Sequence, residues 1–118
     1  MNTFKKLNVW NEAIELVVDV YHLTRRFPKD ETYGLTSQVR RCCVSIASNI
    51  AEGAGRNGKK EFAAFLGMAT GSCCELDTQL ILAEKLGYLK TDETKQVFNR
   101  IDHIQRMTIN LIKKLKEE

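Results

Sequence analysis

The chain has 118 residues, of which 43% are hydrophobic and 28% charged, and these values are ordinary for a globular protein. The length suits one domain over residues 1–118, with a core that needs neither disulfides nor metals. No apolar run is long enough to span a membrane and no signal peptide is visible, so a cytoplasmic location is expected, where the four cysteines stay reduced.

The net charge is +3, and the basic surplus lies in the first half of the sequence. Residues 1–60 hold ten Lys and Arg against six Asp and Glu, whereas residues 61–118 hold eight against nine. A surface for a polyanion such as RNA or DNA is therefore expected in the first half. An ordinary solvated surface is the more common explanation for a surplus of this size.

The first predicted helix covers about Leu7 to Arg26 and has a wide apolar face. Two adjacent stripes at helical spacing together span about 160°, whereas a surface helix needs about 100°. One stripe is Leu7, Trp10, Ile14, Val17 and Tyr21, and the other is Val9, Ala13, Leu16, Val20, Leu23 and Phe27. The excess predicts that this helix packs against more than its own bundle. Pro28 is expected to end it.

The second helix is predicted from Thr32 or Leu35 to Glu52, and the glycine-rich segment 53–58 is expected to end it and reverse the chain. Its apolar positions are Leu35, Val39, Cys42, Cys43, Ile46 and Ile50. Asn49 falls on the same side, so we expect its amide in a polar network.

The third helix is predicted from about Gly58 to Leu86, and its apolar residues repeat at alternating spacings of four and three. This heptad seam is Phe62, Leu66, Ala69, Cys73, Leu76, Leu80 and Ala83. Gly67 and Gly71 lie among small residues, a pattern that predicts a smooth face where another helix approaches closely. Gly87 suits the position after the helix end.

The fourth helix is predicted to follow an N-cap at Thr91 and to reach about Leu115. Its expected buried residues are Val97, Phe98, Ile101, Ile104, Met107, Leu111, Ile112 and Leu115. Because all the turns are short, neighbouring helices should be antiparallel. The sequence therefore predicts an all-α fold, an up-down antiparallel four-helix bundle.

No pattern in the sequence indicates an enzyme, a metal site or a cofactor. The cysteines form two vicinal pairs, Cys42-Cys43 and Cys73-Cys74, that lack the spacing of structural zinc ligands. Small buried hydrophobic residues are the preferred interpretation. His22 and His103 are isolated, and no fingerprint of a nucleophile or a nucleotide-binding loop occurs.

Two basic features have open interpretations. Arg41 lies on one side of the second helix with Ser45 and Ser48, and such a stripe could contact phosphates, or Arg41 could pair with a carboxylate of a neighbouring helix or subunit. The segment from Gly53 to Gly58 opens the third helix beside further basic residues. An N-terminus attracts anions, but a simple chain reversal also explains the glycines.

Several motifs resemble the 23S rRNA intervening-sequence protein family, over nearly the whole chain and in order. They are Phe27-Pro28-Lys29, Glu31-x-Tyr33-Gly34-Leu35, Gln38-x-Arg40-Arg41, Ser45-Ile46, Asn49-Ile50-Ala51-Glu52-Gly53, Lys60-Glu61-Phe62, Phe65-Leu66, Gly71-Ser72, Glu75-Leu76-x-Thr78-Gln79 and Leu86-Gly87-Tyr88. The resemblance implies an up-down four-helix bundle and a ring of five identical subunits. The family is similar to accessory proteins of diversity-generating retroelements, which bind nucleic acid and a reverse transcriptase through a basic surface.

The chain departs from the family pattern at a few positions. Cys42, Cys43 and Cys74 stand where the family usually has alanine or another small residue, and Ala47 stands where proline is common. The chain is also less basic than the retroelement proteins.

The sequence and the resemblance together predict a non-enzymatic homo-oligomer, a pentamer, that binds RNA or DNA weakly through a basic surface. The candidate residues are Arg25, Arg26, Lys29, Arg40, Arg41, Arg56, Lys59 and Lys60. The alternative is a protein adaptor that docks a protein partner, with nucleic acid incidental.

Overall fold

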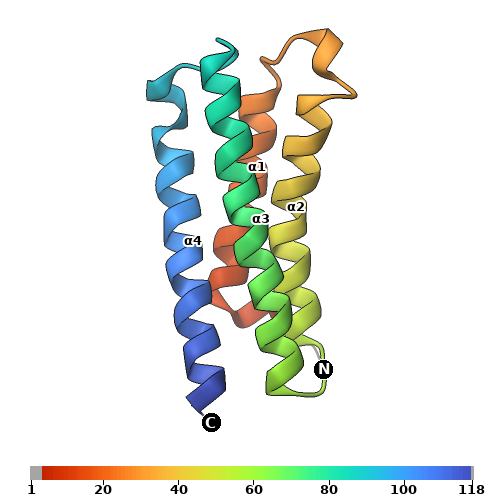
Figure 1. The fold of residues 1–118 in the computed structure, drawn as a ribbon, viewed down its shortest axis with the longest axis vertical. Coiled ribbons are helices and arrows are strands. Elements are labelled where there is room, and N and C mark those ends of the chain that lie inside the picture. Colours follow the sequence, from red (N-terminus) through yellow and green to blue (C-terminus); the bar gives the residue numbers. More distant parts are fainter. Residues whose placement is uncertain (1–3, 118) are drawn as a thin grey trace.

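The computed structural model describes residues 4–117, which form four long helices and two short 3-10 helices. The long helices are α1 (Asn8–Thr24), α2 (Leu35–Ala54), α3 (Lys59–Lys85) and α4 (Thr91–Glu117), and the short ones are η1 (Phe4–Lys6) and η2 (Lys29–Glu31). Each long helix runs antiparallel to the one before it, and α4 returns to lie against α1 (Figure 1). The predicted all-α fold of four sequentially packed helices is confirmed.

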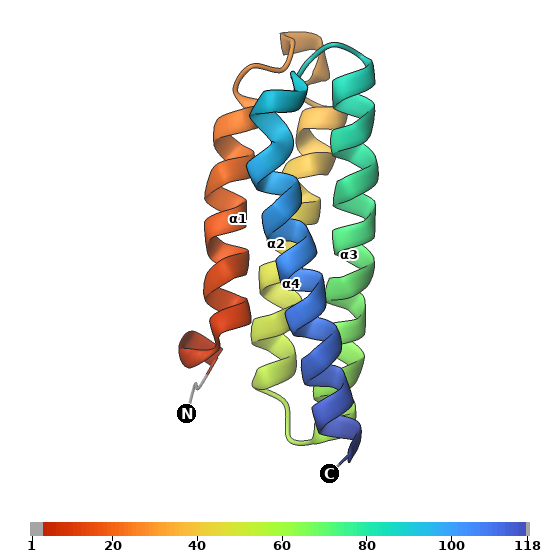
Figure 2. The same ribbon diagram turned by 90° about the vertical axis from the view of Figure 1, so that its left-hand side faces the viewer.

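The bundle is elongated, with extents of 46 × 23 × 20 Å. Both ends of the described chain and the α2–α3 turn lie at one end of it, and the α1–α2 and α3–α4 connections lie at the other (Figures 1 and 2). Hereafter the latter is the upper end. No helix in the described part of the chain is long and apolar enough to cross a membrane.

The core follows the predicted apolar seams. Six of the seven seam residues of α3 are fully buried, and Phe62 is half-buried against them. In α4, Val97, Ile101 and Ile104 are buried, and the remaining predicted residues cover the edge of the core. The predicted apolar positions therefore located the buried face of both helices correctly.

Only one of the two apolar stripes of α1 enters the core. Val9, Ala13, Leu16 and Val20 are buried, whereas Trp10, Ile14 and Val17 are half-buried and Tyr21 is exposed. Trp10, Ile14 and Val17 line a shallow hollow of about 280 Å³ between α1 and α2, which Phe4, Val44, Ala47, Ser48 and Ala51 complete. The wide apolar face of α1 is thus real: one half is buried in the core, and the other half packs at the edge of the core and stays partly exposed.

The predicted end of α2 at Glu52 is wrong by one half-turn, because the helix continues through Gly53 to Ala54. Gly53 is buried where α2 crosses α3, and a Cβ built on it would lie 2.6 Å from Cβ of Phe65. Glycine is required here by the close approach of two helices. The turn itself uses Gly55 and Gly58.

Gly67 and Gly71 were expected to admit a neighbouring helix, and within the chain they do not. Both are exposed, and a Cβ built on either meets nothing within 4 Å. The smooth face of α3 therefore points outward, away from the seam that faces the core.

The predicted helix end at Gly87 is confirmed, whereas α4 begins one residue earlier than an N-cap at Thr91 would require. Gly87 has φ +82°, and the N–H of Tyr88 donates to the carbonyl of Ala83 at 2.9 Å, which closes α3 with a Schellman motif. Thr91 is the first residue of α4 and not the residue before it. The side chain of Glu93 accepts the N–H of Lys90 at 2.9 Å, which satisfies the helix start instead.

Asn49 joins the expected polar network, at the edge of the core. Its amide donates to the carbonyl of Ser45 at 2.9 Å and to the hydroxyl of Ser45 at 3.0 Å. The hydroxyls of Ser45 and Ser72 lie 3.1 Å apart, so this network ties α2 to α3.

Candidate nucleic-acid interface

The structure separates the eight candidate basic residues. Arg25, Arg26 and Lys29 lie at the upper end, where α1 ends and η2 follows, whereas Arg56 and Lys59 lie with Lys60 at the opposite end. The two groups thus lie at opposite ends of the long axis, along which the molecule extends 46 Å. The candidates therefore do not form one continuous surface on a single protomer.

Arg26 and Arg40 are occupied by contacts within the chain. Arg26 forms an ion pair with Glu93 of α4. The guanidinium of Arg40 lies 4.5 Å from the ring centroid of Tyr21, and its Nε donates to the hydroxyl of Thr24 at 2.8 Å. These contacts fix α1 against its neighbours, so they give both arginines a structural role.

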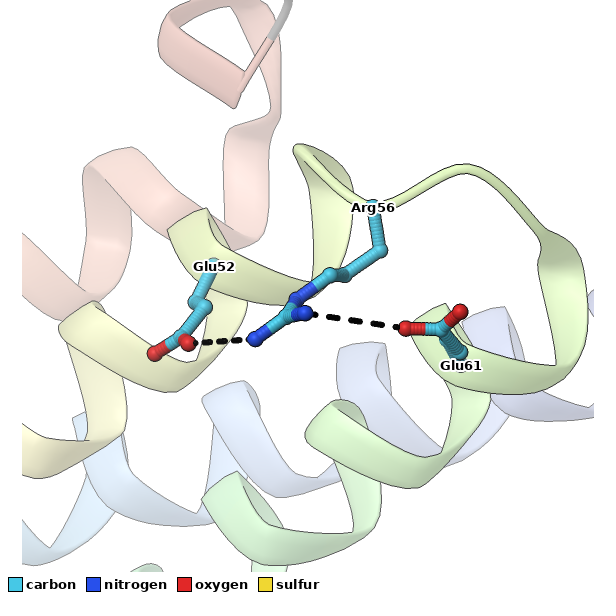
Figure 3. A network of polar contacts seen from close by, with 3 residues as sticks. All are labelled: Glu52, Arg56 and Glu61. Carbon is cyan, nitrogen blue, oxygen red and sulfur yellow. Dashed lines mark hydrogen bonds and ion pairs between the residues drawn. The ribbon is translucent and has the colours of Figure 1, made fainter.

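Arg56 is also held in place, in the α2–α3 turn. One terminal nitrogen lies 2.9 Å from Oε2 of Glu52, and the other lies 3.9 Å from Oε2 of Glu61 (Figure 3). Its guanidinium lies 5.0 Å from the ring centroid of Phe65. Two carboxylates thus offset the charge of Arg56.

Lysines from both ends of the chain join this region. The last turns of α4 bring Lys113, Lys114 and Lys116 to it, and η1 brings Lys5 and Lys6 (Figure 2). Lys116 lines a groove together with Lys59 and Lys60, and Lys114 lines another with Leu7 and Asn8. We name the segments 4–7, 52–61 and 111–117 the basic end.

The basic end carries a strong charge imbalance. Its segments contain eight Lys and Arg against three Asp and Glu, whereas the upper segments 25–31 and 84–95 contain six against five. The N-terminus of α3 has no side-chain cap, and its dipole adds to the same positive potential. Polyanions are attracted by this combination.

The net charge of each half of the sequence did not reveal the lysines that α4 contributes to the basic end, because the second half of the chain has a slight acidic surplus. The signal was available, since the lysine-rich end of a fourth antiparallel helix must lie beside the start of the third. Combining charge with topology finds the basic end, and charge alone does not.

The Arg and Ser stripe of α2 is only partly accessible. Arg41 is exposed and forms no ion pair in the described part of the chain, which leaves it available to an external group. It lines a shallow hollow with Gln38, Cys42 and Glu75. Ser45 is engaged with Asn49 and Ser72, so its hydroxyl is no free phosphate ligand.

Three of the four cysteines behave as small hydrophobic residues, and the expectation of burial is wrong for Cys74. Burial raises the pKa of Cys42 and Cys73 to about 12 and that of Cys43 to about 11. Cys74 is exposed, and its sulfur accepts a hydrogen bond from Gln105. In the described residues no group of three metal-ligating side chains converges.

Comparison with known proteins places these features in a family. The model of the 23S rRNA-intervening sequence protein family matches residues 5–110. The chain belongs to the 23S rRNA-intervening sequence protein family. No curated protein matches the chain.

One solved structure has the same fold over nearly its full length. It is the crystal structure of a protein with unknown function from the S23 ribosomal protein family of Bacteroides thetaiotaomicron VPI-5482, with a TM-score of 0.81 and 21% sequence identity. The match covers 89% of the present chain and 95% of that protein. Identity at this level establishes the shared four-helix fold.

Proposed function

We propose that this 23S rRNA-intervening sequence protein is a non-enzymatic module that binds RNA or DNA weakly, through its basic end. The supporting observation is that Lys59 and Lys60, at the uncapped start of α3, line one groove with Lys116 of α4, while η1 carries Lys5 and Lys6 at the same end of the bundle (Figure 2). Lysines bind phosphate as point charges without reading bases, so the expected binding is independent of sequence and strongly dependent on salt.

The test is titration of labelled single-stranded RNA and DNA at several salt concentrations. The variant Lys59→Glu/Lys60→Glu/Lys116→Glu should weaken binding and reduce the salt slope by about one for each phosphate that the protein no longer neutralises. The control is Arg25→Glu/Lys29→Glu at the upper end. These two residues are also exposed, and each substitution reverses a positive charge in the same way. Absence of binding at low salt, or equal losses in both variants, would refute the proposal.

We also propose that the protein acts as a homo-oligomer, and the family resemblance suggests five subunits. The shallow apolar hollow between α1 and α2 supports a subunit contact there. Light scattering should give a mass near five times the 13.5 kDa of one chain. Val44→Glu, in the hollow, should lower that mass, whereas Tyr33→Glu, at a side chain 96% exposed, should not. A monomeric wild type would contradict this proposal.

A protein adaptor is the second candidate function, and the apolar groove between α3 and α4 favours it. Recovery of one protein partner after nuclease treatment, with no salt-sensitive RNA or DNA binding, would support the adaptor over the nucleic-acid module.

A further inference from the structure

A groove of about 570 Å³ lies between the start of α3 and the end of α4. Its apolar residues are Ala63, Ala64, Gly67, Ile112 and Leu115. Three lysines, Lys59, Lys60 and Lys116, complete the lining. The groove thus has an apolar floor and a basic rim, and no carboxylate lines it.

The floor is shaped for the backbone of another helix. Side chains of one carbon or none line it on α3, and a Cβ built on Gly67 meets nothing within 4 Å. Longer apolar side chains stand only on the α4 side, at Ile112 and Leu115. Small residues allow a helix to approach closely, and interior glycines otherwise cost a helix about 1 kcal/mol each.

The dimensions limit the length of the contact. From Lys60 to Gly67 the floor follows seven residues of α3, or about 10 Å of helix rise. That length accommodates two turns of an amphipathic helix, with apolar anchors spaced i, i+3 or i+4, and i+7. The basic rim requires acidic residues beside those anchors.

We propose that this groove is the docking site for an acidic amphipathic helix of a partner protein. This inference rests on the adaptor function and does not require nucleic-acid binding, although both use the same lysines. A contact of two turns is small, so the complex is weak and reversible.

The experiment measures fluorescence anisotropy of a labelled synthetic peptide of about 16 residues, helical by design, with leucines at the anchor spacing and glutamates beside them. The protein should bind it, and salt should weaken binding. A peptide with lysines in place of the glutamates is the charge control and should not bind.

Gly67→Leu fills the groove without removing any charge, and nothing lies near its Cβ to oppose folding. It should weaken peptide binding about tenfold or more, equivalent to about 1.4 kcal/mol. Gly71→Leu is the matched control, because Gly71 is one turn further along α3, equally open and outside the groove. It should leave binding within about twofold.

Three outcomes would overturn the proposal. Equal affinity of Gly67→Leu and Gly71→Leu for the peptide would mean that the lysines attract any acidic peptide and that the groove plays no part. Binding of the peptide with lysines in place of the glutamates would show that the basic rim does not select acidic partners. A lower oligomer mass for Gly67→Leu but not for Gly71→Leu would identify the occupant as a second copy of this chain. RNA binding by Gly67→Leu is measured in parallel, so failure of the nucleic-acid proposal is detected separately.

Discussion

The hydroxyl of Tyr88 donates a 2.7 Å hydrogen bond to Oε2 of Glu31, across 57 residues of chain. The other carboxylate oxygen of Glu31 accepts the backbone N–H of Leu35 at 3.0 Å and caps the start of α2. A Cβ on Gly34 would lie 2.7 Å from that oxygen, so the glycine leaves room for the cap. One carboxylate therefore joins the two connections of the upper end.

Glu31→Gln should make stability less dependent on pH in the acidic range. The hydrogen bonds from Leu35 and then Tyr88 lower the pKa of Glu31 below its usual 4.5. A lowered folded pKa gives stability that is present above the unfolded pKa and is lost as the pH falls through the folded value. Urea unfolding at neutral pH and below pH 4.5 should measure the free energy of unfolding of wild type and of Glu31→Gln. The difference in free energy between the two proteins should be smaller at the lower pH. A constant difference would contradict this role for the carboxylate.

Gly53→Ala should destabilise the protein by about 1–3 kcal/mol, because the new Cβ forces α2 and α3 apart at Phe65. Gly71→Ala is the control, and it should stabilise by about 0.5–1 kcal/mol, since the site is open and alanine favours helix. Denaturant unfolding gives both values. Similar changes of one sign would show that helix propensity, and not the close approach, decides the outcome at residue 53.

Arg100→Met should lower the free energy of unfolding by about 1–2 kcal/mol. The guanidinium of Arg100 lies 3.2 Å from Oε1 of Glu12 and 3.4 Å from Oδ2 of Asp19, and its side chain is 22% exposed. Removing it leaves two carboxylates of α1 without their shared cation, although partial exposure of both acids limits the cost.

Arg106→Met is the matched control for that change. Arg106 pairs with Asp102 at 2.9 Å along the surface of the same helix, and its side chain is 76% exposed. Its loss should cost no more than about 0.5 kcal/mol. Equal effects of the two variants in urea unfolding would mean that the α1–α4 pairing adds nothing beyond a surface ion pair.

One thiol per chain should react rapidly with a thiol reagent in the folded protein. Cys74 is exposed, whereas burial shields Cys42, Cys43 and Cys73 and raises the pKa of each. Thiolate is the reactive form, so the three buried thiols should react only after unfolding. Cys74→Ala should remove the rapid phase. More than one rapid thiol would reveal local opening of the α2–α3 interface.

The sequence predicted most of the fold because the buried positions repeat with helical period. Leu66, Cys73 and Leu80 of α3 are fully buried as the seam requires. At Gly53 the prediction failed, because a glycine that ends a helix and a glycine that admits a neighbouring helix look alike in one dimension. Only the three-dimensional approach of Phe65 distinguishes the two roles.

The candidate site was predictable only in part. Lys59 and Lys60 do lie in a basic region, but Arg26 and Arg40 are committed to Glu93 and Tyr21. Pairings between α1 and its neighbours join residues far apart in sequence, so no local pattern marks them. Lys116 enters the region through the path of α4, which depends on the packing of the whole bundle.

Because both ends of the described chain lie beside the basic end, any fusion partner there is tethered close to the lysines (Figure 2). A short flexible tether holds its cargo at an effective concentration of about millimolar, so an acidic tag would compete with a weak ligand at every measurement. Labels are better attached near Tyr33, in the upper connection, where the side chain is 96% exposed. A dye at that site lies at the opposite end of the long axis from the lysines of the basic end.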